Sequence, residues 1–88
     1  MKVIVTNRFL NDIARIKLKE VVDQALFYID YCEKVHLPDE IPGFKYLRQY
    51  TGKGRIELAP FRIGVEISGN SIIFIRILSR DEIYNQFP

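Results

Sequence analysis

Cysteine and histidine are scarce in this chain of 88 residues, which has one of each, Cys32 and His36. A single cysteine excludes an internal disulfide. The two residues are four apart, so one helix face can hold both, but two ligands do not make a metal site and the chain has no others. We therefore expect no metal and no cofactor. Cys32 is expected to be a small helix residue that faces the core.

Long apolar runs and a strong excess of one charge are also lacking. We find no 18-residue apolar run and no basic-apolar leader pattern, so we expect a cytoplasmic protein with no membrane partner. The formal net charge is only +2, far from that of a general nucleic-acid coat protein. Residues 1–44 hold 6 Lys and Arg against 7 Asp and Glu, whereas residues 45–88 hold 7 against 4. The two halves therefore carry net charges of −1 and +3, so the net positive charge lies in the second half.

The first half of the sequence predicts one strand followed by two helices. Residues 2–6 are typical of a short strand, and Thr6 or Asn7 can cap the helix that follows. Apolar residues then recur at helical spacing in residues 9–16 and again in residues 18–32. Two prolines and a glycine then break this pattern, so a loop carries the chain to its second half.

The second half predicts two strands joined by a hairpin. In residues 61–67 every odd position is apolar, which is the period-two pattern of a strand with one buried face. In residues 71–78 both parities are apolar apart from Arg76, which indicates a central strand. Residues 68–70 are small and suit a tight turn, so the strands run antiparallel. Arg62 and Arg76 are then expected to share the face that points away from the core.

These elements predict an α+β fold, with residues 1–88 as one domain. The helical hairpin must bury its apolar stripe, and the odd-numbered face of residues 61–67 is the obvious partner. The N-terminal strand completes a mainly antiparallel four-stranded sheet. The opposite face of that sheet is expected to stay open.

Arginines are the chemically informative side chains of the second half. A guanidinium stays charged at any working pH and grips phosphate through a planar fork, so arginines on a rigid sheet point to a phosphate-rich ligand. Cleaving RNA without a metal requires a base, cations for the charged phosphorane and a proton donor for the leaving oxygen. The residues that supply these types are Arg55, Arg62, Arg76, Arg80, Lys53, Glu57 and Tyr84.

Several motifs, in this order and spacing, resemble the C-terminal core of the RelE/ParE toxin superfamily. They are Arg55-Ile56-Glu57-Leu58, Phe61-Arg62-Ile63-Gly64-Val65-Glu66-Ile67, Ile73-Phe74-Ile75-Arg76-Ile77-Leu78-Ser79-Arg80-Asp81-Glu82-Ile83-Tyr84 and Phe87-Pro88. The upstream Ile41-Pro42-Gly43-Phe44-Lys45-Tyr46-Leu47 is similar to the turn that precedes this core in the family. With the helical first half, the resemblance covers nearly the whole chain. It implies a RelE/ParE-like fold and the toxin of a toxin–antitoxin system.

The resemblance also implies an activity, that of a metal-independent, ribosome-associated endoribonuclease that cleaves mRNA and inhibits translation. By carry-over, Arg62 holds the scissile phosphate and Tyr84 stacks on a base or transfers a proton. Arg55 and Arg80 act as supporting cations. Glu57, at a position where many relatives carry a basic residue, is available as the general base. Further RNA contacts are assigned to Lys53, Arg76, Lys45 and Arg48.

Departures from the family pattern leave two other functions open. Ser79 occupies the place of a frequent histidine, and Ala59-Pro60 replaces a Gly-Asp or similar turn. The chain is alternatively a ParE-like inhibitor of DNA gyrase without enzyme activity. In a further alternative it is a catalytically weakened homologue that only binds its antitoxin.

Single residues have structural alternatives as well. Arg62 is alternatively a solvated residue paired with Glu57 or Glu66, and Tyr84 alternatively packs with Phe87. Arg76 alternatively forms an internal ion pair with Glu66. Arg80 alternatively does no more than begin a helical turn.

The expected partners follow from the resemblance. A small cognate antitoxin would wrap the toxin and cover its active face. The helical hairpin and the sheet edge are the candidate docking surfaces, with Tyr28, Tyr31 or Tyr46 as anchors. The other expected partners are mRNA and the ribosome, or DNA gyrase in the ParE-like alternative.

Overall fold

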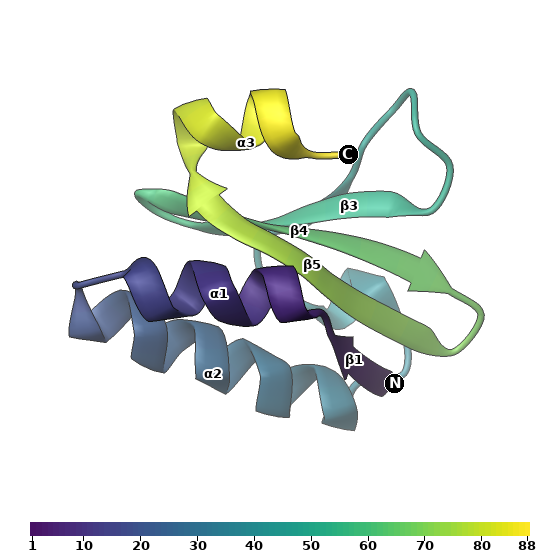
Figure 1. The fold of residues 1–88 in the computed structure, drawn as a ribbon. Helices are drawn as coiled ribbons and strands as arrows, with labels where there is room; N and C mark the ends of the chain where they lie inside the picture. The colour runs from purple at the N-terminus through teal and green to yellow at the C-terminus, as the bar shows by residue number, and fades with distance from the viewer.

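The computed structural model describes residues 1–88. Two helices lie on one face of a sheet and a third lies on the other face (Figure 1). In chain order the elements are β1 (Lys2–Val5), α1 (Asn7–Arg15), α2 (Lys19–Lys34), the 3-10 helix η1 (Pro38–Glu40), β2 (Phe44–Tyr46), β3 (Lys53–Leu58), β4 (Phe61–Ser68), β5 (Ser71–Ser79) and α3 (Arg80–Gln86).

The sheet has five strands in the order β1-β5-β4-β3-β2. β1 runs parallel to β5, and the other neighbours are antiparallel. The α+β class and the β4–β5 hairpin agree with the sequence prediction, but the expected count of four strands was wrong. Phe44 and Tyr46, predicted only as part of a turn, pair with Ile56 and Gly54 of β3. A strand of three residues is too short to show a period of two.

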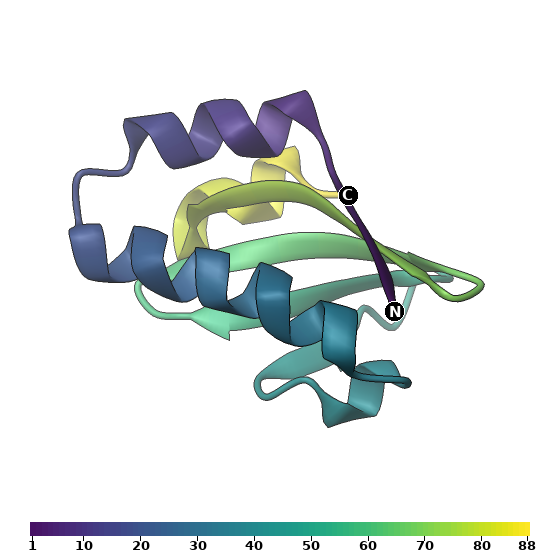
Figure 2. The same ribbon diagram turned by 90° about the horizontal axis from the view of Figure 1, so that it is seen from below.

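The core lies between the sheet and helices α1 and α2, which lie against the same face of the sheet (Figure 2). As predicted, Ile63 and Val65 of β4 face this core and are fully buried. Phe9 of α1 meets Phe74 of β5 edge to face, with ring centroids 5.5 Å apart. Cys32 is also fully buried, and this burial raises the pKa of its thiol to about 11.

Helix α1 begins where β1 ends, at the edge of β5. Thr6 is its N-cap, and its Oγ1 accepts a hydrogen bond from the backbone N–H of Phe9 at 3.1 Å. The same hydroxyl donates to the carbonyl of Ile75 at 2.9 Å, which fixes α1 to β5. None of the helices is both long enough and apolar enough to cross a membrane.

A β-bulge interrupts the pairing of β4 with β5. Gly64 pairs with Arg76 and Val65 pairs with Phe74, so Ile75 has no cross-strand partner. Phe74 and Ile77 are consequently both buried, although regular alternation would place residues 74 and 77 on opposite faces. The extra residue leaves Arg76 opposite Gly64, on the side of α3.

The sheet face opposite α1 and α2 is partly covered rather than open as predicted. Helix α3 lies across it (Figure 1), and its Ile83 is buried against the sheet together with Phe87. The Phe87 ring lies directly over Gly64, where an added Cβ would come within 2.7 Å of it. Ser79 caps the helix by accepting a hydrogen bond from the N–H of Glu82 at 3.3 Å. Arg80 therefore begins a complete short helix.

Candidate functional site

Alternate residues of β3 and β4 bring charged side chains together on the α3 side of the sheet. The pairing sets Lys53 opposite Glu66, Arg55 opposite Gly64, and Glu57 opposite Arg62. Cross-strand neighbours of opposite charge attract one another on a shared face. Two cross-strand ion pairs result, Lys53 with Glu66 and Arg62 with Glu57. A third pair joins two residues of β3, since Arg55 Nε lies 4.0 Å from Glu57 Oε1.

Arg62 is the centre of this cluster. Its side chain is 8% exposed, and its Nε lies 2.7 Å from Glu57 Oε1. Its Nη1 donates a hydrogen bond to the Tyr84 hydroxyl at 2.9 Å, and its guanidinium carbon lies 5.6 Å from the centre of the Tyr84 ring. The alternative of a solvated Arg62 was therefore right about Glu57 but wrong about solvation. The alternative of a packed Tyr84 was wrong, since Tyr84 is 62% exposed while Phe87 is buried.

These contacts change the acidity of both groups. The hydrogen bond from Arg62 and its positive charge lower the pKa of Tyr84, and Arg80 and Arg55 lower it further. Burial alone would lower the pKa of Arg62, but Tyr84 and Glu57 together raise it. Arg62 therefore stays charged, and the Tyr84 phenol becomes a stronger acid. Of the three arginines, Arg62 is hydrogen-bonded to the Tyr84 hydroxyl, whereas Arg55 and Arg80 lie near enough to contribute to the lowered pKa.

A hollow of about 340 Å³ lies beside Tyr84, between α3 with the C-terminal residues and the loop that joins β2 to β3. Arg48 and Arg55, both singled out from the sequence, line it. Sequence reasoning missed Tyr50, which also lines the hollow and is 49% exposed. Its only sequence signal was an aromatic residue within a loop. The other lining residues are Leu47, Gln49, Ile83, Tyr84, Phe87 and Pro88.

Other predicted RNA contacts lie outside this hollow. Lys53 is engaged by Glu66. Lys45 is exposed on β2, where its backbone position is opposite that of Arg55 on β3. Arg76 was expected to pair with Glu66, and this expectation was wrong. The true partner of Arg76 is Asp12, which the sequence analysis did not single out.

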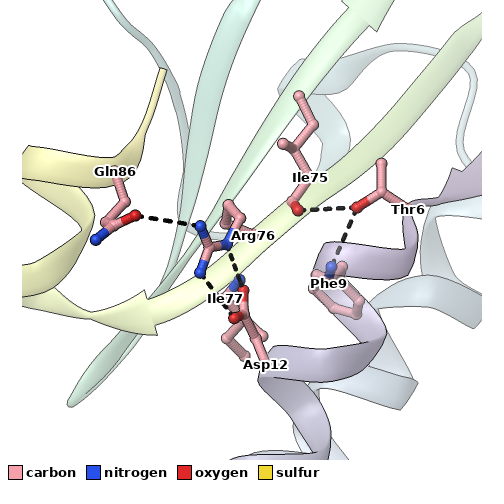
Figure 3. A network of polar contacts seen from close by, with 7 residues as sticks. All are labelled: Thr6, Phe9, Asp12, Ile75, Arg76, Ile77 and Gln86. Atoms are coloured by element: carbon pink, nitrogen blue, oxygen red, sulfur yellow. Dashed lines mark hydrogen bonds and ion pairs between the residues drawn. The ribbon is translucent and has the colours of Figure 1, made fainter.

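The Asp12–Arg76 pair is buried at the edge of β5 (Figure 3). Arg76 Nε donates to Asp12 Oδ2 at 2.7 Å, and Nη2 donates to Oδ1 at 2.9 Å. Asp12 Oδ2 also accepts the backbone N–H of Ile77 at 3.1 Å. Arg76 is thus directed towards α1, although its strand position is on the α3 side. The two residues are 64 apart in sequence, so no local pattern predicts their contact.

The donor types that metals prefer are scattered over the structure. It brings together no group of three or more His, Cys, Asp or Glu side chains that could hold a metal ion.

Comparison with known proteins shows which toxins the chain resembles. No family model matches the chain. It is 29% identical to Toxin RelE3 of Methanocaldococcus jannaschii over an alignment of 89 positions that covers the full length of both proteins. The structure superposes on a chain of the RelB–RelE antitoxin–toxin complex from Methanococcus jannaschii with a TM-score of 0.82 and 26% identity, covering 97% of this chain and 99% of that one. In sequence and in fold, the chain is RelE-like over its whole length.

The RelE-like fold extends to more distant structures. An archaeal RelE–RelB complex from Pyrococcus horikoshii OT3 matches with a TM-score of 0.73 and 16% identity, covering 90% of this chain and 93% of that one. At this identity the match concerns the fold alone. In the RelE-like chain described here, that fold brings the cation of Arg62 into contact with the carboxylate of Glu57 and with the phenol of Tyr84. Of these three side chains, Tyr84 lines the hollow. The three groups are of the types that metal-free phosphodiester cleavage needs.

Proposed function

We propose that this RelE-like toxin cleaves mRNA as a metal-independent, ribosome-associated endoribonuclease and thereby inhibits translation. The observation that carries the proposal is the 2.9 Å hydrogen bond from Arg62 to the Tyr84 hydroxyl, whose pKa is lowered mainly by Arg62 and further by Arg80 and Arg55. The names of the relatives support the toxin assignment. The residue roles are our inference from the geometry.

In the proposed reaction the ribose 2′-oxygen attacks the adjacent phosphorus and the bond to the 5′-oxygen breaks, which leaves a 2′,3′-cyclic phosphate. Glu57 accepts the proton of the 2′-hydroxyl, and Tyr84 gives its proton to the departing 5′-oxygen. Arg62 and Arg55 stabilise the negative charge that develops on the phosphoryl oxygens. The lowered pKa of Tyr84 supports its role as the donor.

A carboxylate beside the scissile phosphate would ordinarily oppose binding. Here the Arg62 guanidinium lies against Glu57 Oε1 and compensates its charge. The Glu57 side chain is 42% exposed, so it remains accessible to a substrate hydroxyl. The Arg62–Glu57 pair therefore supports a general base at a position where a second cation was expected from the family pattern.

The experiment is primer extension on translated messages after induction of the wild type and of Arg62→Ala, Tyr84→Phe and Glu57→Gln. We expect codon-positioned cuts with the wild type and a loss of about 10²-fold or more for each variant, which is typical of removing one acid–base or charge-stabilising group. Lys19→Ala, on the outer face of α2, is the control and should cut normally.

Two results contradict the proposal. One is an absence of wild-type cuts combined with inhibition of DNA supercoiling, which supports the gyrase alternative. The other is growth arrest of equal strength in the wild type and the three site variants, which supports a toxin that acts by binding alone.

We also propose that a cognate antitoxin docks on α2. Solved relatives are antitoxin–toxin complexes, which supports a protein partner of this kind. We infer anchors other than Tyr28 and Tyr31, because the hydroxyls of these tyrosines donate to the carbonyls of Pro42 and Glu40 within the toxin itself. The large apolar side chains that α2 exposes are instead Leu26, 53% exposed, and Phe27, 61% exposed. Tyr46 is 51% exposed on β2, at the far edge of the sheet.

A further inference from the structure

A second cationic hollow lies between α1 and α3, away from the Tyr84 hollow. Arg8, Asp12 and Arg15 follow one another at intervals of four and three residues, so they share one face of α1. That face borders a hollow of about 310 Å³ whose other lining residues are Asn11, Arg76 and Gln86. No apolar side chain lines it.

The charges in this hollow do not cancel, because three arginines meet one aspartate. Asp12 is committed to Arg76, since both of its carboxylate oxygens accept hydrogen bonds from that guanidinium (Figure 3). Arg8 and Arg15 are exposed and form no ion pair in the structure. The guanidinium groups of Arg8 and Arg15 therefore remain for a ligand, next to the buried Asp12–Arg76 ion pair.

The position of the hollow connects it to the proposed cleavage site. Helix α3 contributes Tyr84 to one hollow and Gln86 to the other. The Gln86 side chain accepts a hydrogen bond from Arg76 Nη1 at 3.4 Å (Figure 3). Residues two apart on a helix point in nearly opposite directions, so the two hollows flank α3.

We propose that the α1–α3 hollow binds backbone phosphates of the same RNA strand, beyond the segment that is cut. This proposal rests on the proposed function and extends it by a second phosphate subsite. Guanidinium forks recognise phosphate oxygens in pairs. A docked acidic peptide would also need apolar contacts at the centre of its interface, and this hollow offers none.

The test measures binding of a short RNA whose riboses are 2′-O-methylated, so that it cannot be cut, by fluorescence anisotropy at several salt concentrations. The variant Arg8→Ala/Arg15→Ala should bind about tenfold or more weakly. Its slope of log K against log salt should fall by about 1.4, because each single-strand phosphate contact contributes about 0.7. Unchanged thermal unfolding should show that the variant is folded.

The charge-matched control is Lys19→Ala/Lys34→Ala, which removes two positive charges from exposed positions on α2. It should weaken binding less than twofold. Equal losses in the two double variants would overturn the proposal, because they would show a general effect of net charge. Stronger displacement of the RNA by a polyglutamate peptide than by unlabelled RNA would also overturn it, in favour of an acidic protein ligand.

The assay separates this inference from the proposed function. Wild-type cleavage together with unchanged RNA binding by Arg8→Ala/Arg15→Ala removes the second subsite and leaves the nuclease. Weakened binding in that variant together with no wild-type cleavage keeps the subsite and removes the nuclease.

Discussion

At the scale of the residue, the informative feature is a buried arginine that keeps its charge. Burying an unpaired guanidinium is costly, and Arg62 avoids this cost through Glu57 on β3 and Tyr84 on α3. Arg62 and Tyr84 differ in exposure, since the Arg62 side chain is 8% exposed and Tyr84 is 62% exposed. The charged guanidinium of Arg62 is therefore buried beside a tyrosine that a ligand can reach.

The acidity of Tyr84 gives a direct prediction at this scale. Ultraviolet difference titration of the wild type should show one tyrosine that ionises at a lower pH than the others, because nearby arginines stabilise its phenolate. Tyr84→Phe should abolish this early step, and Arg62→Gln should move it to higher pH. If Tyr84 donates a proton, cleavage should decline as pH rises through this same step. An early step that persists in Tyr84→Phe would assign the lowered pKa to another tyrosine.

At the scale of the element, α3 depends on the absence of a side chain at Gly64. The Phe87 ring occupies the space over this glycine and anchors the chain just after the helix. Because α3 carries Tyr84, we expect the packing of Phe87 to influence the distance between the tyrosine and Arg62. We therefore expect the geometry of the site to depend on the glycine at position 64.

We expect Gly64→Ala to displace Phe87, since the new Cβ would lie 2.7 Å from the ring. Such overpacking costs about 1–3 kcal/mol in the free energy of unfolding. Gly54→Ala is a matched control, because its Cβ would meet the Phe44 ring at 2.6 Å. Urea denaturation should show a similar loss in both variants, but only Gly64→Ala should return the Tyr84 pKa towards its ordinary value. Equal titration curves for the two variants would mean that Phe87 does not position α3.

The elements also show how far the sequence alone could be interpreted. Strand β4 was predictable because odd positions are apolar and even positions are polar or glycine. The partner of Arg76 was not, because the bulge at Ile75 lies in a run that is apolar on both parities and so leaves no trace in the pattern. Arg62, Tyr84 and Glu57 were identified together, and the cross-strand contact of Arg62 with Glu57 was among the alternatives. The contact of Arg62 with Tyr84 depends on α3, for which the sequence offered only a helical turn beginning at Arg80 as an alternative. Tyr50 was missed because it lies in a loop, and loops have no periodic pattern. Arg8 and Arg15 of α1 were missed because the hollow that they line also needs Arg76, which reaches Asp12 from 64 residues along the chain.

At the scale of the whole molecule, the two faces of the sheet have separate tasks. Helices α1 and α2 cover one face and form the main core with it, and α3 lies on the other face (Figure 1). The Tyr84 hollow lies on the α3 side, whereas the second cationic hollow lies between α1 and α3. The exposed Leu26 and Phe27 belong to the first side. A partner that docks on α2 therefore contacts a surface that contributes nothing to the Tyr84 hollow.

This separation predicts that antitoxin binding and toxicity can be uncoupled. Leu26→Glu/Phe27→Glu should weaken the complex with the co-expressed antitoxin by about 30-fold or more, the effect of losing a hot spot of about 2 kcal/mol. Toxicity in the absence of antitoxin should stay normal. Size-exclusion chromatography and growth on induction measure the two properties, with Lys34→Glu as a control on the same helix. An intact complex in the double variant would place the docking surface elsewhere.

The unpaired Ile75 has a consequence for comparing relatives of different length. A homologue shorter by one residue at this point would lose only the bulge, and each following side chain would stay on its present side of the sheet. The same deletion elsewhere in β5 would reverse every later position and turn Arg76 or Ile77 to the wrong side. A change of length by this one residue is therefore tolerated best at Ile75 within β5. We expect gaps in alignments with relatives to cluster at this position.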